Sequence, residues 1–124
     1  MVVALLDALR RGEVRALEAA TTHLARLHDV HGETGAIAWF DDERALADAA
    51  ALDEAYRAGG PVGPLHGLPV TVKDWIDVAG FPCAGGQGDH RDRRPSRDAT
   101  VVARLRHAGA VVLAKTAVWD GLDR

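Results

Sequence analysis

Apolar residues in the first quarter of the chain recur at the three- and four-residue spacing of amphipathic helices. Leu5, Leu6 and Leu9 lie on one face of a predicted first helix, which ends at Gly12. The same spacing continues through residues 17–27 and predicts a second helix. The chain is therefore predicted to begin with two helices that each bury one face.

A third helix is predicted from Asp41 or Asp42 to about Ala58. Either aspartate can cap its N-terminus, and the acidic residues of its first turn suit the helix dipole. The helix is rich in alanine and stops at Gly59-Gly60. The narrow apolar stripe predicted to face the core consists of Ala45, Ala49, Leu52 and Tyr56.

Three short apolar runs lack helical spacing and predict strands at residues 36–40, 70–73 and 110–113. Residues 70–73 are predicted to form a buried strand, and residues 110–113 are a continuous apolar run of the kind typical of buried and mostly parallel strands. Between them, Asp98 can cap a helix with Val101, Val102 and Leu105 on its apolar face.

This order of elements predicts an α/β fold in which helices pack on a partial mixed β-sheet, within a single domain over residues 1–124. Because about three strands cannot shield both faces of a sheet, we expect the chain to be the front portion of a larger domain.

Composition excludes several classes of protein. With 48% apolar residues, 27% charged residues and a net charge of −3, the 124-residue chain resembles one globular domain and not a nucleic-acid-binding surface. No apolar run is long enough to span a membrane, and the N-terminus lacks the pattern of a signal peptide, so a cytoplasmic location is expected. Cys83 is the only cysteine, which excludes an internal disulfide.

Neither a metal nor an organic cofactor is expected. His23, His28 and His31 are spaced so that they do not all share one helical face. The glycine-rich residues 85–88 lack the G-K-[ST] of a phosphate-binding loop.

Lys73 is the leading catalytic candidate. The chain has thirteen arginines but only two lysines, and Lys73 ends an apolar strand that follows a loop rich in proline and glycine. Side chains alternate across a strand, so Thr71, Lys73 and Trp75 share one face while Asp74 points to the other. Apolar surroundings would disfavour the charged amine, which is the condition for a general base.

Other interpretations of these residues are open. Lys73 could extend into solvent or pair with Asp77. Cys83 could form a nucleophile pair with Lys73 if the long loop after the strand folds back, although a small packing residue is the simpler interpretation. His66 could be a polar group on the substrate side or a structural loop residue.

Residues 63–74, which read GPLHGLPVTVKD, resemble the lysine motif of the amidase signature family, and Ile76-Asp77-Val78-Ala79-Gly80 continues the match. The similarity extends to residues 97–102 and to residues 108–116, which read AGAVVLAKT. It covers nearly the whole chain.

The resemblance implies an enzyme that hydrolyses amide C–N bonds without a metal or organic cofactor. Members use a serine nucleophile, a second serine joined through a cis peptide bond, and a lysine base, and by motif match Lys73 is that lysine. Their serines and oxyanion-hole donors lie in a later Gly/Ser-rich segment. The only serine here, Ser96, sits in a charged loop between Pro95 and Arg97. We therefore expect the chain to supply the lysine for a small-molecule amide substrate and to be inactive alone.

A non-catalytic alternative is a remnant or interaction module that associates with itself or a second chain through an exposed sheet edge. After Lys115-Thr116 the chain reads Ala117-Val118-Trp119, where family members usually read N-x-x-E. A fragment, a frameshifted gene product and one half of a split enzyme are all compatible with this departure. The motifs do not select one amide substrate or one oligomeric state.

Overall fold

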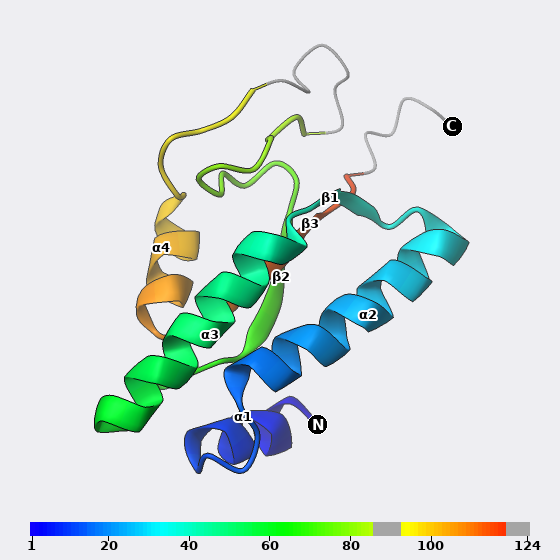
Figure 1. Ribbon diagram of the computed structural model, residues 1–124. Helices are drawn as coiled ribbons and strands as arrows, with labels where there is room; N and C mark the ends of the chain where they lie inside the picture. Colours follow the sequence, from blue (N-terminus) through cyan, green and yellow to red (C-terminus); the bar gives the residue numbers. More distant parts are fainter. Residues whose placement is uncertain (86–92, 119–124) are drawn as a thin grey trace.

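The computed structural model describes residues 1–85 and 93–118, and it confirms the predicted α/β class (Figure 1). The elements in order are α1 (Val2–Arg10), α2 (Ala16–Thr34), β1 (Ile37–Phe40), α3 (Asp42–Gly59), β2 (Pro69–Lys73), α4 (Thr100–His107) and β3 (Val111–Thr116). Of these helices, none is both long enough and apolar enough to cross a bilayer. Most of the predicted glycine-rich turn at residues 85–88, and the chain end after Val118, lie outside the described residues.

The sheet is mixed, as predicted, with the strand order β1-β3-β2. The central strand β3 pairs antiparallel with β1 and parallel with β2. Residues 111–115 of β3 are all buried, as expected for an interior strand. The prediction that β2 is a buried strand is wrong, because β2 lies at the edge of the sheet and only its Val72 is buried.

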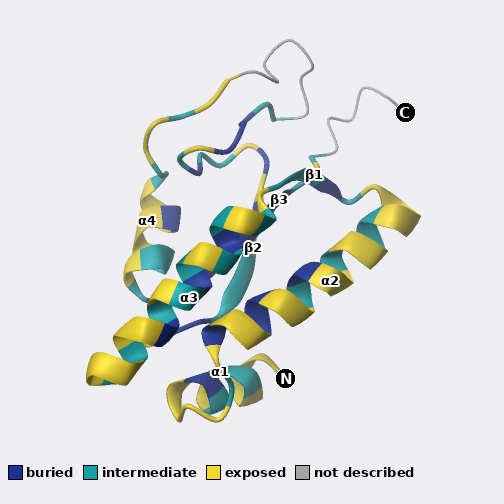
Figure 2. Ribbon diagram, viewed as in Figure 1, coloured by how far each residue is buried: buried dark blue, intermediate teal, exposed yellow. Residues whose placement is uncertain are grey.

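Two layers cover the two faces of the sheet. On one face, α2 and α3 pack small side chains such as Ala20 and Ala49 against Val111 and Leu113 of β3. On the other face, Val102 of α4 packs against Val112 together with residues of the loop that follows β2. Figure 2 shows the result, with the buried stripes of α2 and α3 turned toward the strands and their outer faces exposed.

The two aspartates predicted as caps behave differently. Asp41 caps α3, because its Oδ1 accepts a hydrogen bond from the Arg44 backbone N–H at 3.1 Å. The prediction for Asp98 is wrong: α4 begins at Thr100, and Asp98 Oδ1 instead accepts from the Ala79 N–H at 2.8 Å. The carboxylate thus connects the loop after β2 to the start of α4.

The predicted apolar faces are also corrected in part. In α3 the buried positions are Ala45, Ala49 and Asp53, so the core-facing stripe contains a carboxylate. In α4, Val102 is buried but Val101 is half exposed. Val101 belongs to a surface that the described residues leave open.

Asp53 of α3 caps the start of α2 across the interface between the two helices. Its Oδ1 accepts from the Ala16 N–H at 2.7 Å and its Oδ2 from the Leu17 N–H at 3.1 Å. Because Asp53 and Ala16 are both buried, water cannot replace these bonds easily.

Replacing Asp53 with alanine is expected to lower the free energy of unfolding by about 2–3 kcal/mol, because two backbone donors lose their acceptor. Asp53→Asn retains one acceptor oxygen and should cost about half as much. Urea unfolding of the three proteins measures both effects. An alanine variant as stable as the parent chain would show that the cap contributes nothing.

Candidate functional site

Lys73 lies at the carboxyl end of β2, where the parallel strand β3 also ends. The predicted alternation is confirmed, since Thr71, Lys73 and Trp75 are exposed while Val72 and Asp74 are buried. In open α/β sheets, ligands bind beyond the carboxyl ends of the strands. The position of Lys73 is therefore one at which a binding site is expected.

The apolar surroundings predicted for Lys73 are not present in this chain. The side chain is exposed, because Lys73 is the last residue of the edge strand β2. Asp77, the alternative partner, is bound by Arg93 instead, at Nη1–Oδ1 and Nη2–Oδ2 distances of 2.8 and 3.1 Å. Among the described residues Lys73 has no ion pair, so the amine extends into solvent.

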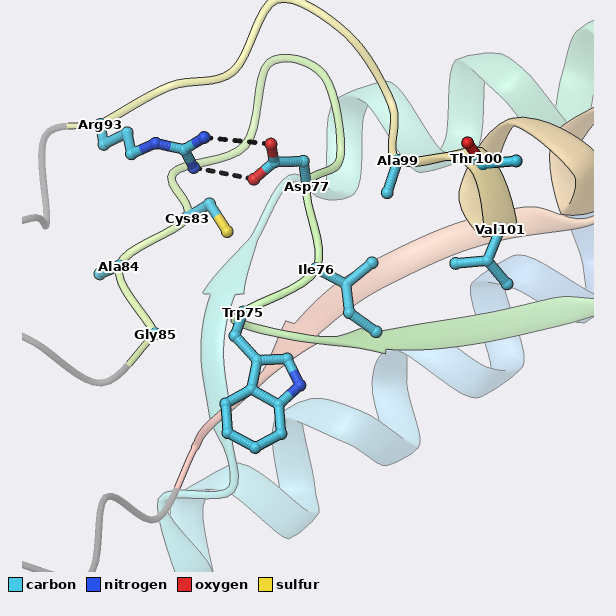
Figure 3. A pocket seen from close by; sticks show the side chains of 10 residues that line it. All are labelled: Trp75, Ile76, Asp77, Cys83, Ala84, Gly85, Arg93, Ala99, Thr100 and Val101. Carbon is cyan, nitrogen blue, oxygen red and sulfur yellow. Dashed lines mark hydrogen bonds and ion pairs between the residues drawn. The ribbon is translucent and has the colours of Figure 1, made fainter.

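A hollow with a volume of about 820 Å³ opens beside this strand end, between the loop after β2 and the start of α4 (Figure 3). Trp75, two residues after Lys73 and 65% exposed, extends along one side of it. The Arg93–Asp77 pair lies on another side. Its lining is Trp75, Ile76, Asp77, Cys83, Ala84, Gly85, Arg93, Ala99, Thr100 and Val101, and it does not include Lys73.

The ion pair with Arg93 keeps the Asp77 carboxylate ionised at the edge of the hollow. Hydrogen bonding to Arg93, more than any other contact, lowers the pKa of Asp77 from 3.8 to about 2. The same contact raises the pKa of Arg93. Asp77 is therefore an anion at neutral pH and is unsuited to act as a proton donor.

Cys83 does not form the hypothesised nucleophile pair with Lys73. Its side chain is buried, and Sγ donates a hydrogen bond to the backbone oxygen of Asp74 at 3.2 Å. Burial raises the pKa of the Cys83 thiol, and the nearby Asp77 carboxylate adds to this effect. A thiol held in its neutral form is a poor nucleophile, which supports the packing role.

The buried lysine of this region is Lys115 of β3, which was not among the site residues predicted from the sequence. Its side chain is fully buried, and Nζ lies 3.4 Å from Asp74 Oδ1 and 3.4 Å from the Pro82 backbone oxygen. Asp74 Oδ1 also accepts from Trp39 Nε1 at 3.1 Å. A signal was present, because Lys115 is the only other lysine in an arginine-rich chain and follows an apolar strand.

The backbone of Asp74, which directly follows Lys73, is held by hydrogen bonds in addition to the buried pair of Asp74 with Lys115. The Asp74 N–H donates to the Thr116 oxygen at 3.0 Å, and the Asp74 oxygen accepts from the Gly85 N–H at 3.1 Å as well as from Cys83. The main chain is thus fixed on both sides of Asp74. It follows that the Cα position of Lys73 is well defined, although its amine is free to move.

The three histidines of α2 make structural contacts. His23 Nδ1 bonds to the Ala19 oxygen, and His31 Nδ1 accepts from the Ile37 N–H. His28 Nε2 lies 2.8 Å from Asp42 Oδ2, and its ring stacks on Phe40. Within residues 1–85 and 93–118, no three histidine, cysteine or acidic side chains gather in a way that could hold a metal ion.

His66 lies at the other end of β2 from Lys73, so the structure does not bring these two candidates together. It is buried, and its Nδ1 accepts from the Val62 N–H at 3.1 Å. Burial lowers the pKa of His66 below 6.5, and this effect outweighs the opposing attraction of Asp53.

This lowered pKa predicts a loss of stability in mild acid. The unfolded chain takes up a proton at His66 near pH 6.5, whereas the folded chain takes it up only at lower pH. Stability from this group is therefore complete above pH 6.5 and decreases as the pH falls toward the folded-state pKa. This pH range is separate from that of Asp77, whose contribution to stability is lost as the pH falls from 3.8 to about 2.

Thermal unfolding across this range measures the effect. We expect His66→Asn, which keeps an acceptor for Val62 but cannot titrate, to show a flatter dependence of Tm on pH between neutrality and mild acid. The same slope in parent and variant would show that His66 does not carry this dependence.

Comparison with known proteins identifies relatives among amide-processing enzymes. The family model described as Amidase matches residues 18–122. The chain is 43% identical over 106 residues to a glutamyl-tRNA(Gln) amidotransferase subunit from Salinispora tropica, covering 86% of this chain and 22% of that protein. It is 36% identical over 109 residues to indoleacetamide hydrolase from Bradyrhizobium diazoefficiens, covering 88% and 21%.

Solved structures share the fold. The peptide amidase from Stenotrophomonas maltophilia superimposes with a TM-score of 0.86 at 35% identity, covering 93% of this chain and 24% of that one. A structure from a vestigial protein complex, described as revealing the evolutionary origins of an s-triazine catabolic enzyme, gives a TM-score of 0.88 at 31% identity and covers 94% of this chain and 26% of that one. The chain thus spans about a quarter of the length of the proteins it matches.

Proposed function

The chain belongs to the amidase family, and we propose that it supplies the lysine base of an amide-hydrolysing active site, with Lys73 as that base. The proposal rests on the motif around Lys73 and on the similarity to the relatives described above. Their names have one chemical group in common, a carboxamide whose C–N bond is cleaved or whose nitrogen is transferred. The proposed substrate class is therefore a carboxamide.

In the proposed reaction the neutral Lys73 amine receives the proton of a serine hydroxyl, relayed by a bridging serine. The serine oxygen attacks the amide carbon, and the C–N bond breaks as the proton passes to the leaving nitrogen. Water then releases the acid from the acyl-enzyme. Both serines and the oxyanion donors are proposed to come from a segment outside residues 1–124, because the only serine here is Ser96.

One structural observation carries the proposal: Lys73 is exposed at the carboxyl end of β2, which runs parallel to β3. A lysine whose role was to stabilise this chain would have a partner, as Lys115 does. We propose that the segment carrying the serines packs over Lys73 and Trp75. This packing would exclude water from the amine and thereby favour its neutral, basic form.

The proposal predicts that the 124-residue chain is inactive by itself. Incubation with a simple carboxamide such as indoleacetamide should release ammonia no faster than buffer does, because the chain contains a base but no activated nucleophile. Hydrolysis that disappears on Lys73→Ala would contradict the requirement for a second segment. A Ser96→Ala variant distinguishes that result from an unexpected role of the only serine.

A second candidate, a non-catalytic interaction module, is favoured by the position of β2 at the sheet edge. An exposed edge strand can pair with another chain or with a second copy. Size-exclusion chromatography distinguishes the interaction module from the catalytic proposal, because the module requires association through β2. A chain that stays monomeric would contradict this candidate and leave the catalytic proposal.

A further inference from the structure

A second cavity, with a volume of about 290 Å³, lies at the opposite end of β2 from Lys73. It is formed where α1, the start of α2 and the end of α3 meet the loop before β2. The lining residues are Leu9, Gly12, Val14, Arg15, Asp53, Tyr56, Arg57 and His66. This volume is at the lower end of the range for ligand sites and fits a molecule with a single ring.

His66 presents an unused hydrogen-bond donor in this cavity. Its side chain is 2% exposed, and its Nδ1 accepts from the Val62 N–H. In a neutral imidazole whose Nδ1 is an acceptor, the proton must be on Nε2. No described residue accepts a hydrogen bond from that nitrogen. Nε2 is not among the atoms that are sealed from solvent without a partner, so a ligand or a water molecule that enters the cavity can supply its acceptor.

The backbone of His66 is held firmly, so the donor has a fixed position. The neighbouring Leu65 and Gly67 N–H groups donate to the oxygens of Ala108 and Gly109 at 2.9 and 2.8 Å. A Cβ at Gly109 would lie 2.8 Å from the His66 Cα, which shows how closely the two turns pack. The donor is therefore preorganised.

The charges around the cavity favour an anionic acceptor. Arg15 and Arg57 are both exposed and contribute to the lining. Asp53 is the only acidic residue of the lining, and both of its oxygens already accept N–H groups of α2. Arg57 pairs with Glu54 at 3.1 Å, but both side chains are more than half exposed, so a ligand can compete for the guanidinium.

The apolar part of the lining selects the body of the ligand. Leu9 and Val14 provide aliphatic surface, and the Tyr56 ring lies 5.3 Å from the imidazole of His66. The Tyr56 hydroxyl donates to the Arg10 oxygen at 3.0 Å, so the ring is held in place. Aromatic faces of this kind pack well against a flat ring.

We propose that this cavity is a binding site for a small carboxylate with a flat apolar body, separate from the site at Lys73. The carboxylate accepts from His66 Nε2 and pairs with Arg57 or Arg15, while the ring packs between Leu9, Val14 and Tyr56. The site does not depend on the proposed catalytic role of Lys73.

The experiment is an NMR titration of the 124-residue chain with benzoate, with benzamide and benzylamine as probes of equal size. Benzoate should shift the ring signals of His66 and Tyr56 saturably, and benzamide should bind about tenfold more weakly because it lacks the charge. Benzylamine should leave these signals unchanged. No saturable shift with benzoate, or equal shifts with all three probes, would overturn the proposal.

Two variants and a control test the named contacts. Arg57→Gln should weaken benzoate binding about tenfold, whereas Arg104→Gln, the same change on an exposed residue of α4, should not alter it. His66→Asn retains an acceptor for Val62 but lacks the Nε2 donor, and it should abolish saturable binding in a protein whose spectrum is still that of a folded chain. Equal weakening by Arg57→Gln and Arg104→Gln would show a general charge effect and contradict the site.

Discussion

Replacing Lys115 with methionine is expected to lower the free energy of unfolding by about 3–5 kcal/mol, because Asp74 is left as a buried carboxylate without its cation. Lys115 is fully buried and Asp74 is 3% exposed, so water cannot take the place of the ammonium group. The total stability of a small domain is about 5–15 kcal/mol, so this change removes a large share of it.

A matched control is available in the same chain. Lys73→Met makes the same chemical change at an exposed lysine and should alter stability by less than about 0.5 kcal/mol. The double variant Lys115→Met with Asp74→Asn removes both charges but keeps an acceptor for Trp39 Nε1. It should recover most of the loss, because burying a neutral pair avoids the cost of an unpaired charge.

Urea unfolding of the four proteins measures these differences. If Lys115→Met is as mild as Lys73→Met, or if the double variant is no more stable than the single one, Lys115 and Asp74 are not coupled. If Lys115→Met is unfolded even without urea, the stability of the double variant still shows whether Lys115 and Asp74 are coupled.

The helices could largely be predicted from the sequence, since periodicity and glycine positions are local signals. Of the two aspartates predicted as alternative caps of α3, Asp41 is the one that caps it. Asp98 is not, because the Ala79 N–H, nineteen residues away in the chain, competes for its carboxylate. Such competition depends on tertiary contacts that local patterns do not contain.

The order of the strands explains the main errors at the site. An apolar run such as that of β2 is compatible with a central or an edge strand, and only the pairing with β3 places it at the edge. The exposure of Lys73 and the burial of Lys115 both follow from that arrangement. The role proposed for Lys73 comes from the family motif, whereas the partners of Lys115 are visible only in the folded chain.

The second large effect is expected in a hybrid enzyme. Residues 2–116 of this chain would replace the corresponding segment of the peptide amidase from Stenotrophomonas maltophilia, which has the same fold over this region. The hybrid should hydrolyse peptide amides, and Lys73→Ala should lower kcat by at least about a thousandfold, since the base that activates the nucleophile is lost.

Controls separate a catalytic effect from a structural one. Because Lys73 has no ion pair among the described residues, Lys73→Ala should leave the Tm of the isolated chain nearly unchanged. Lys73→Arg keeps a cation but holds it permanently protonated, so it should be as inactive as the alanine variant. An active Lys73→Arg hybrid would show that charge at this position, and not proton transfer, is what the reaction needs.

The most direct measurement of the central claim is the rate at which a fluorophosphonate labels the serine nucleophile of the hybrid, because this reaction reports activation of the hydroxyl without a choice of substrate. We predict labelling that slows by at least about a hundredfold on Lys73→Ala and does not change on an exposed control such as Arg104→Gln. Equal labelling rates with and without the amine at position 73, in hybrids of equal stability, would contradict the role of Lys73 as the base.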